Sequence, residues 1–139
     1  MDIRIYPGKL KGTVKAPPSE SVAHRALICA SLAEGRSVIR GISGSRDMDA
    51  TIGCMRALGA DIRREEGDIA VVEGIGSDSG IFHPEGEKMA QKTATLDCIE
   101  SGSTLRFLLP VAAALGAEVS FEGRGKLPER PMTPLADEM

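Results

Sequence analysis

Residues 19–35 of the chain read SESVAHRALICASLAEG, a stretch with the composition and flanks of one amphipathic helix. Two consecutive prolines come immediately before it, so the chain enters it in an extended conformation. Ser19 or Ser21 can supply the N-cap, and Gly35 is placed to end the helix with a positive φ. The interior is rich in alanine and leucine, which favour helix. The sequence therefore predicts a helix here, around which the rest of the chain is organised.

The start of this predicted helix has the features of an anion site. It combines free backbone N–H groups, serine hydroxyls and the guanidinium of Arg25 about one turn inside. The helix dipole, the N–H donors and the guanidinium all favour a phosphate or a carboxylate. A capped core helix with an outward-facing arginine fits the same residues. Both interpretations stay open on local physics alone.

Composition excludes several functional classes. With 139 residues, of which 42% are hydrophobic and 27% charged, the chain fits one globular domain or a large piece of one. A net charge of −3 and 3% aromatic residues, without tryptophan, argue against a general nucleic-acid binder. No apolar run is long enough to span a bilayer, and the first residues lack the apolar core of a signal peptide.

The sequence around the cysteines and around His83 gives no sign of a metal or catalytic site. Cys29, Cys54 and Cys98 are an odd number, lack metal-ligand spacing and have apolar neighbours. We expect reduced thiols in the core of a cytoplasmic protein. Residues 74–92 are rich in glycine, serine and charge, which predicts a long surface loop with His83 exposed.

The pattern along the chain alternates helices and strands. The expected elements are strands at 2–6 and 10–15, the first helix, a strand at 36–40, a helix at 47–58, strands at 61–64, 69–72 and 95–98, a helix at 101–115, a strand at 118–121 and a helix from Pro131. Pro110 falls inside the third helix and predicts a kink or an irregular turn. The sequence LGADI at 58–62 recurs as LGAEV at 115–119. Repeated helix, glycine and strand units predict an α/β or α+β layered fold.

Three segments carry motifs. Residues 18–27 read PSESVAHRAL, residues 97–106 read DCIESGSTLR, and residues 127–132 read LPERPM. In this order they resemble the 5-enolpyruvylshikimate-3-phosphate synthase family, the 3-phosphoshikimate 1-carboxyvinyltransferases. The family patterns are Ser-Lys-Ser followed by His or Asn and Arg-Ala-Leu, then Asn/Glu-Ser-Gly-Thr/Ser-Thr-x-Arg, then Glu-Arg-Pro-Met/Ile. The resemblance covers essentially the whole chain.

The resemblance implies a fold and a reaction. It implies repeated inverted α/β units with helices packed on a mixed sheet, and an active site between two domains. Residues 1–16 would be strands belonging with the other domain, and residues 17–139 would form a partial enolpyruvyl transferase domain. The reaction would transfer the enolpyruvyl group of phosphoenolpyruvate to the 5-hydroxyl of shikimate 3-phosphate. Both partners would be small anionic molecules, and no metal or organic cofactor would be used.

The resemblance also implies roles for individual residues. Ser21 and Arg25 would hold the phosphate end of shikimate 3-phosphate. Gly102 would let the backbone approach phosphoenolpyruvate closely, because it has no side chain. Arg130 would bind the phosphate or the carboxylate of phosphoenolpyruvate. Ser21 as a cap and Gly102 as a turn residue are the alternatives.

Three more residues of the second motif are further candidates for the site. Glu100 and Ser103 flank the Ser-Gly pair, and Arg106 follows it by about one turn. We expect Arg106 to support the loop, with an outward ion pair as the alternative. The carboxylates and the lysine that act as general acid and base in the family would lie in its second domain, so no catalytic residue is assigned in this chain.

Two residues depart from the family pattern inside these motifs. Glu20 occupies the position of the family's lysine, which contacts both anionic substrates. Two like charges about 4 Å apart repel by roughly 1 kcal/mol in water, so we expect severe loss of activity. Ile99 stands where the family usually has glycine. If this position needs a positive φ, its β-branched side chain strains the loop.

The length departs as well. Family members are much longer, so we expect a piece that holds half the site, does not turn over alone and self-associates through unpaired strand edges. Two alternatives stay open. One is a related enolpyruvyl transferase acting on a UDP-sugar, although its motifs are not visible. The other is a non-catalytic α/β module that binds an anion or a protein partner.

Overall fold

The computed structural model describes residues 2–76 and 94–137 of the chain. Its elements are α1 (Glu20–Leu32), β1 (Arg36–Arg40), α2 (Arg46–Ala57), β2 (Asp61–Glu65), β3 (Ile69–Glu73), β4 (Ala94–Asp97), α3 (Gly102–Ala114), β5 (Val119–Glu122) and α4 (Thr133–Asp137). This order confirms the predicted alternation of helices and strands. Most of the loop predicted at 74–92, with His83, lies outside the described residues.

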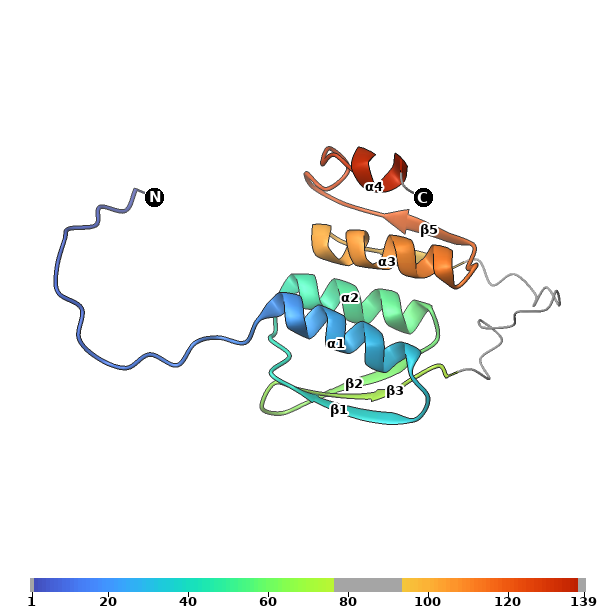
Figure 1. The fold of residues 1–139 in the computed structure, drawn as a ribbon, viewed down its shortest axis with the longest axis horizontal. Coiled ribbons are helices and arrows are strands. Elements are labelled where there is room, and N and C mark those ends of the chain that lie inside the picture. Colours follow the sequence, from blue (N-terminus) through green and yellow to red (C-terminus); the bar gives the residue numbers. More distant parts are fainter. Residues whose placement is uncertain (1, 77–93, 138–139) are drawn as a thin grey trace.

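Three long helices lie between two small sheets (Figure 1). In the larger sheet β3 is central and pairs antiparallel with both β1 and β2. In the smaller sheet β4 pairs parallel with β5, which places Leu96 opposite Phe121. The predicted α/β class is confirmed, and the described strands form two separate sheets, one antiparallel and one parallel.

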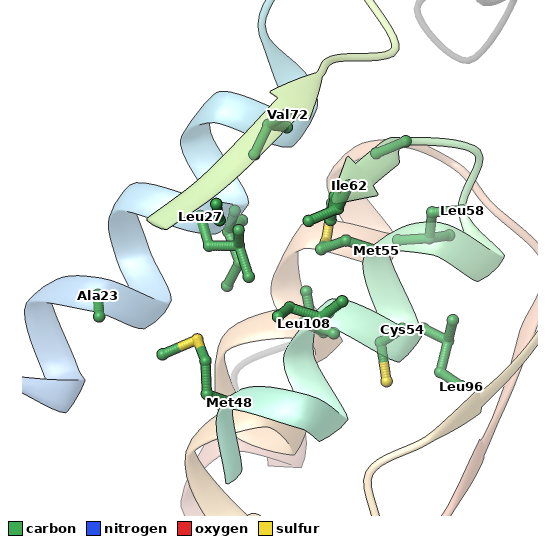
Figure 2. Packing of buried hydrophobic residues seen from close by; sticks show 14 of the residues in the cluster. Ala23, Leu27, Met48, Cys54, Met55, Leu58, Ile62, Val72, Leu96 and Leu108 are labelled. Carbon is green, nitrogen blue, oxygen red and sulfur yellow. The ribbon is translucent and has the colours of Figure 1, made fainter. Parts of the chain in front are cut away.

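The core fills the space between the helices and the inner face of the larger sheet (Figure 2). Leu27 of α1, Met55 of α2 and Leu108 of α3 are fully buried and point into it. Ile62 and Val72 supply the sheet side, because alternate strand residues face the same way. Burying such a side chain contributes about 1.5–3 kcal/mol, so these five positions fix how the layers stack.

The two LGA repeats end their helices in the same way. Gly59 and Gly116 have φ of 113° and 61°, and each donates to a carbonyl three residues earlier at 2.9 and 3.0 Å. The next residue in each repeat donates five residues back, which completes a Schellman motif. Glycine is suited to this positive φ. α3 continues through Pro110, where a kink or an irregular turn was predicted, and Pro110 is exposed on the outside of the helix.

The strands predicted at 2–6 and 10–15 are absent. Residues 2–19 form no helix or strand, all of them are exposed, and they lead away from the helices and sheets (Figure 1). A strand needs a neighbouring strand for its backbone groups, and no described segment runs beside these residues. Within the described ranges, no helix is long and apolar enough to cross a membrane.

Two predicted helix starts were wrong by a residue or two. α2 begins one residue before Asp47, because the Oγ of Ser45 accepts from the Met48 N–H at 3.3 Å and caps the helix there. α4 begins at Thr133 and not at Pro131, and its first backbone hydrogen bond runs from the Leu135 N–H to the carbonyl of Met132 at 3.0 Å.

One of the three predicted core thiols was placed wrongly. Cys54 and Cys98 are buried, with 1% and 0% of their surface exposed. Cys29 is exposed, because it lies on the outer face of α1. All three thiols are free, as predicted.

Candidate functional site

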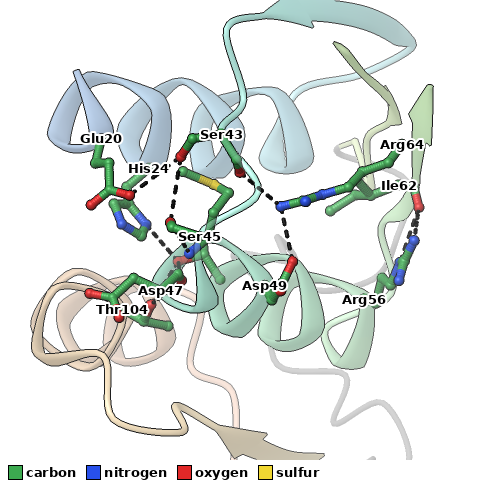
Figure 3. Close-up of polar contacts among 12 residues, drawn as sticks. Glu20, His24, Ser43, Ser45, Asp47, Asp49, Arg56, Ile62, Arg64 and Thr104 are labelled. Carbon is green, nitrogen blue, oxygen red and sulfur yellow. Dashed lines mark hydrogen bonds and ion pairs between the residues drawn. The ribbon is translucent and has the colours of Figure 1, made fainter. Parts of the chain in front are cut away.

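The first turn of α1 carries three candidate residues of the first motif. Ser19 occupies the N-cap position without a side-chain hydrogen bond, and Ser21 lies inside the helix, so neither hydroxyl caps it. The Oε1 of Glu20 accepts from the Oγ of Ser43 at 3.3 Å (Figure 3). Arg25 donates from Nη1 to the carbonyl of Ser21 at 2.8 Å. The hydrogen bonds of Glu20 and Arg25 therefore hold the start of α1 in place.

Arg25 connects this turn to α3. Its guanidinium carbon lies 4.6 Å from the centre of the Phe107 ring, within the range of a cation–π contact. The His24 ring lies 6.2 Å from the same ring. Arg25 is exposed, so its remaining N–H groups can reach an anion from solvent.

The start of α3 brings three more candidates together. Ser101 caps the helix by accepting from the Thr104 N–H at 3.2 Å. A Cβ on Gly102 would lie 2.7 Å from the Nη1 of Arg106 and 2.8 Å from the Nη1 of Arg130. Both guanidiniums therefore face the bare α-carbon of Gly102. The prediction placed these residues in one site, and the structure brings them to one point.

The two arginines at Gly102 are held differently. Arg106 donates to the carbonyls of Gly102 and Pro131 at 3.5 and 3.3 Å, so it ties the start of α3 to the third motif. The side chain of Arg130 has no hydrogen bond or ion pair within the described residues. Two like charges close together are stabilised by an anion between them. The arrangement can bind a phosphate or a carboxylate.

The loop before α3 is strained at the position marked by the sequence. Ile99 has a φ of 54°, which branched side chains rarely adopt. Its N–H donates to the Oδ1 of Asp97 at 2.9 Å, and its carbonyl accepts from the Arg124 N–H at 2.6 Å. The backbone bonds on both sides hold the residue in this conformation. The positive φ considered for this position is confirmed.

Glu100 and Ser103, the two other candidates of the second motif, lie on either side of the Ser101–Gly102 pair. The carboxylate of Glu100 packs on the α-carbon of Gly125, and its Oε2 lies 3.9 Å from the Nη1 of Arg46. Ser103 is half-buried in the first turn of α3. Glu100 therefore contacts the loop that carries Gly125 and the start of α2, and its role toward a ligand stays a prediction.

Sequence reasoning missed a buried polar network beneath both motifs. The Nδ1 of His24 lies 2.7 Å from the Oγ1 of Thr51, which lies 2.7 Å from the Oγ1 of Thr104. The Oγ1 of Thr104 lies 2.8 Å from the Oγ of Ser101 and 3.3 Å from the carbonyl of Asp47. All four side chains are at most 1% exposed. The available signal was a threonine at each of two helix positions that face the core.

Burial is the main influence on His24. It lowers the pKa of the imidazole below its usual value, while the carboxylates of Asp47 and Glu20 raise it in part and Arg25 lowers it. These carboxylates lie near the ring where the helix starts meet (Figure 3). His24 is therefore neutral at pH 7, and it can donate or accept through Nδ1 depending on its tautomer.

One cavity near α3 lies on a different face. It has a volume of about 470 Å³ and is lined by Leu105 of α3, Phe121 of β5, Leu127 and neighbouring residues of the loop after β5. Neither Arg106 nor Arg130 lines it. The candidate site is the surface where α1 and α3 begin, and not this cavity.

The comparisons with known proteins agree on one family. Residues 5–139 match the family model of EPSP synthase (3-phosphoshikimate 1-carboxyvinyltransferase). The 3-phosphoshikimate 1-carboxyvinyltransferase of Clostridioides difficile (strain 630) is 50% identical over 130 residues, which are 94% of this chain and 29% of that protein. The enzyme of that name from Clostridium botulinum (strain Eklund 17B / Type B) is 48% identical over 93% of this chain and 28% of its own length.

A solved structure shares the fold. EPSP synthase from Acinetobacter baumannii matches with a TM-score of 0.68 at 24% identity, over 91% of this chain and 27% of that one. The chain thus spans less than a third of the length of these relatives. On the family match over residues 5–139, the chain belongs to the EPSP synthase family.

Proposed function

We propose that this chain forms the part of an EPSP synthase that binds shikimate 3-phosphate and phosphoenolpyruvate. In the complete enzyme the 5-hydroxyl of shikimate 3-phosphate attacks phosphoenolpyruvate, and phosphate leaves to give 5-enolpyruvylshikimate 3-phosphate. The single observation that supports this role best is the bare α-carbon of Gly102 between the guanidiniums of Arg106 and Arg130. Phosphoenolpyruvate carries a phosphate and a carboxylate, and two guanidiniums suit both groups.

Shikimate 3-phosphate is assigned to the neighbouring turn. Ser21 and Arg25 lie at the exposed start of α1, where the helix dipole favours an anion. Glu20 in the same turn opposes this, because its carboxylate repels a phosphate. Binding to the chain with Glu20 is therefore weak, and a cation at this position strengthens it.

The test is the binding of phosphoenolpyruvate to the 139-residue chain and to Gly102→Ala, measured by calorimetry in the wild-type and Glu20→Lys backgrounds. A Cβ at position 102 displaces two arginine tips and leaves the backbone in place, because those tips are flexible. We expect Gly102→Ala to weaken binding at least about tenfold while the fold is kept.

Gly53→Ala is the matched control. Gly53 also lies in a helix, and a Cβ there meets nothing within 4 Å, so binding stays unchanged. Equal affinities of Gly102→Ala and Gly53→Ala would contradict the assignment. So would a folded Glu20→Lys chain that binds no phosphoenolpyruvate.

One observation favours a second candidate, a non-catalytic module. Glu20 is hydrogen-bonded to Ser43 at the start of α1, so the carboxylate is held in the position assigned to an anion. A chain that binds neither substrate with Glu20 or with lysine supports this candidate. The cytoplasmic location and the self-association through free sheet edges stay predictions.

A further inference from the structure

The buried network connects the two helices that form the site, α1 and α3, through the neighbouring helix α2. Thr51 lies in the middle of α2 and shares hydrogen bonds of 2.7 Å with His24 of α1 and with Thr104 of α3. Thr104 continues the contact to Ser101, the cap of α3. An unbroken series of polar atoms therefore runs from the turn that carries Arg25 to the turn that carries Gly102.

This network is a costly way to fill a core. Each buried hydroxyl or imidazole loses its water and needs partners inside the protein. Valine has nearly the volume of threonine and would fill the space of Thr51 without that requirement. A fully hydrogen-bonded network fixes the relative positions of the helices, because all its hydrogen bonds can form in only one arrangement. Within the described residues, no buried side-chain nitrogen or oxygen lacks a partner.

The hydrogens of the network are ordered by His24. If Nδ1 accepts, the single hydrogen of Thr51 goes to His24, so Thr104 must donate to Thr51 and can no longer donate to Ser101. If Nδ1 donates to Thr51, the Thr51 hydroxyl can donate to Thr104 or to the carbonyl of Asp47 at 3.4 Å, and Thr104 can donate to Ser101. The state of the His24 ring therefore reaches the cap of α3 through Thr51.

We propose that Thr51 is a positioning residue, which holds the Ser21–Arg25 turn and the Gly102–Arg106 turn in one fixed arrangement. It acts through His24, which precedes Arg25, and through Thr104, which lies between Gly102 and Arg106 in the first turn of α3. The ligand that this arrangement serves rests on the proposed function. The coupling between the helices does not.

The first measurement needs no ligand. NMR spectra of the 139-residue chain follow the His24 Hε1 resonance and the Thr104 amide between about pH 4.5 and 7.5, because His24 titrates below its usual range. The groups that face the ring and titrate or carry charge are Asp47, Glu20 and Arg25. We expect the Thr104 amide to shift with the same midpoint as His24. The shift is lost in Thr51→Val and kept in Thr51→Ser.

The second measurement titrates the same three proteins with shikimate 3-phosphate. We expect the dissociation constant to rise about tenfold in Thr51→Val, the effect of removing one hydrogen bond of a network, and to return to within about threefold in Thr51→Ser. Thr51→Ser keeps the hydroxyl and loses one methyl group, so it separates the hydrogen bond from packing.

Each outcome decides one of the two proposals. A Thr104 amide that ignores His24 in the wild type, or follows it equally in Thr51→Val, overturns the positioning role. Equal affinities of the wild type and Thr51→Val overturn it too. A chain that does not respond to shikimate 3-phosphate either with Glu20 or with lysine at position 20 contradicts the proposed function alone, because the first measurement still decides the coupling.

Discussion

Glycine should stabilise position 99 more than alanine does, the reverse of the usual order. Ile99 has a φ of 54°, and a left-handed conformation costs an L residue with a Cβ roughly 1–2 kcal/mol. Glycine avoids that cost but loses about 0.5–1 kcal/mol through the greater entropy of its unfolded chain. The difference leaves Ile99→Gly more stable than Ile99→Ala by about 0–1.5 kcal/mol, with a midpoint of about 0.75 kcal/mol.

The comparison with isoleucine itself is less informative, because the side chain is half-buried. Removing it forfeits roughly half of the 1.5–3 kcal/mol of a fully buried isoleucine, which offsets the relief of strain. Ile99→Gly is therefore expected close to the wild type, and Ile99→Ala about 1 kcal/mol below it. Both backbone bonds of Ile99 survive either substitution.

Urea unfolding followed by circular dichroism measures these differences. Ala113→Gly, on the exposed face of α3, is the control and should lose about 1 kcal/mol, as glycine does in a helix. An Ile99→Gly protein that is less stable than Ile99→Ala by the amount seen at the control position would refute the strain at position 99.

Three further outcomes follow from the same contacts. Glu20→Lys should lower the free energy of unfolding by about 0.5–1 kcal/mol, because it replaces a favourable acidic residue at the start of α1 by a cation. Glu129→Lys, in an exposed loop, is the control and should not lower it. Urea unfolding measures both variants. Because the pKa of His24 is lowered on folding, the unfolded chain binds more protons in acid, so stability should fall as the pH drops below about 6.5. His24→Gln should flatten this part of the stability-versus-pH curve, and an unchanged slope would contradict the burial of a neutral imidazole. A maleimide should label Cys29 within the time that leaves Cys54 unlabelled, since the second thiol is buried and hydrogen-bonding raises its pKa, and mass spectrometry of the native chain would show this order.

Local signals explain why much of the fold could be predicted. Helical sequence patterns located α1, α2 and α3, and the glycines of the two LGA repeats marked where α2 and α3 end. The strands predicted at 2–6 and 10–15 failed for a physical reason. Their alternating apolar residues indicate strand, but a strand forms only with a partner, and the sequence pattern cannot supply one.

The candidate site likewise has one part that the sequence could predict and one part that it could not. The motifs named Gly102, Arg106 and Arg130 as candidates, and the structure brings these three residues close together, while their roles toward a ligand stay predictions. The network escaped prediction, since Thr51 is 27 residues from His24 and 53 from Thr104. Contacts of that separation depend on how three helices pack, and local periodicity gives no information about them.

The most direct test of the half-site is a titration of the labelled chain with shikimate 3-phosphate, followed by amide NMR shifts, with Glu20→Lys beside the wild type. The account predicts shifts confined to residues 19–26 and 100–106, with binding to Glu20→Lys at least about tenfold tighter, because a repulsive charge near the phosphate becomes attractive. A folded Glu20→Lys chain whose amides in both segments stay unmoved at saturating ligand would contradict it.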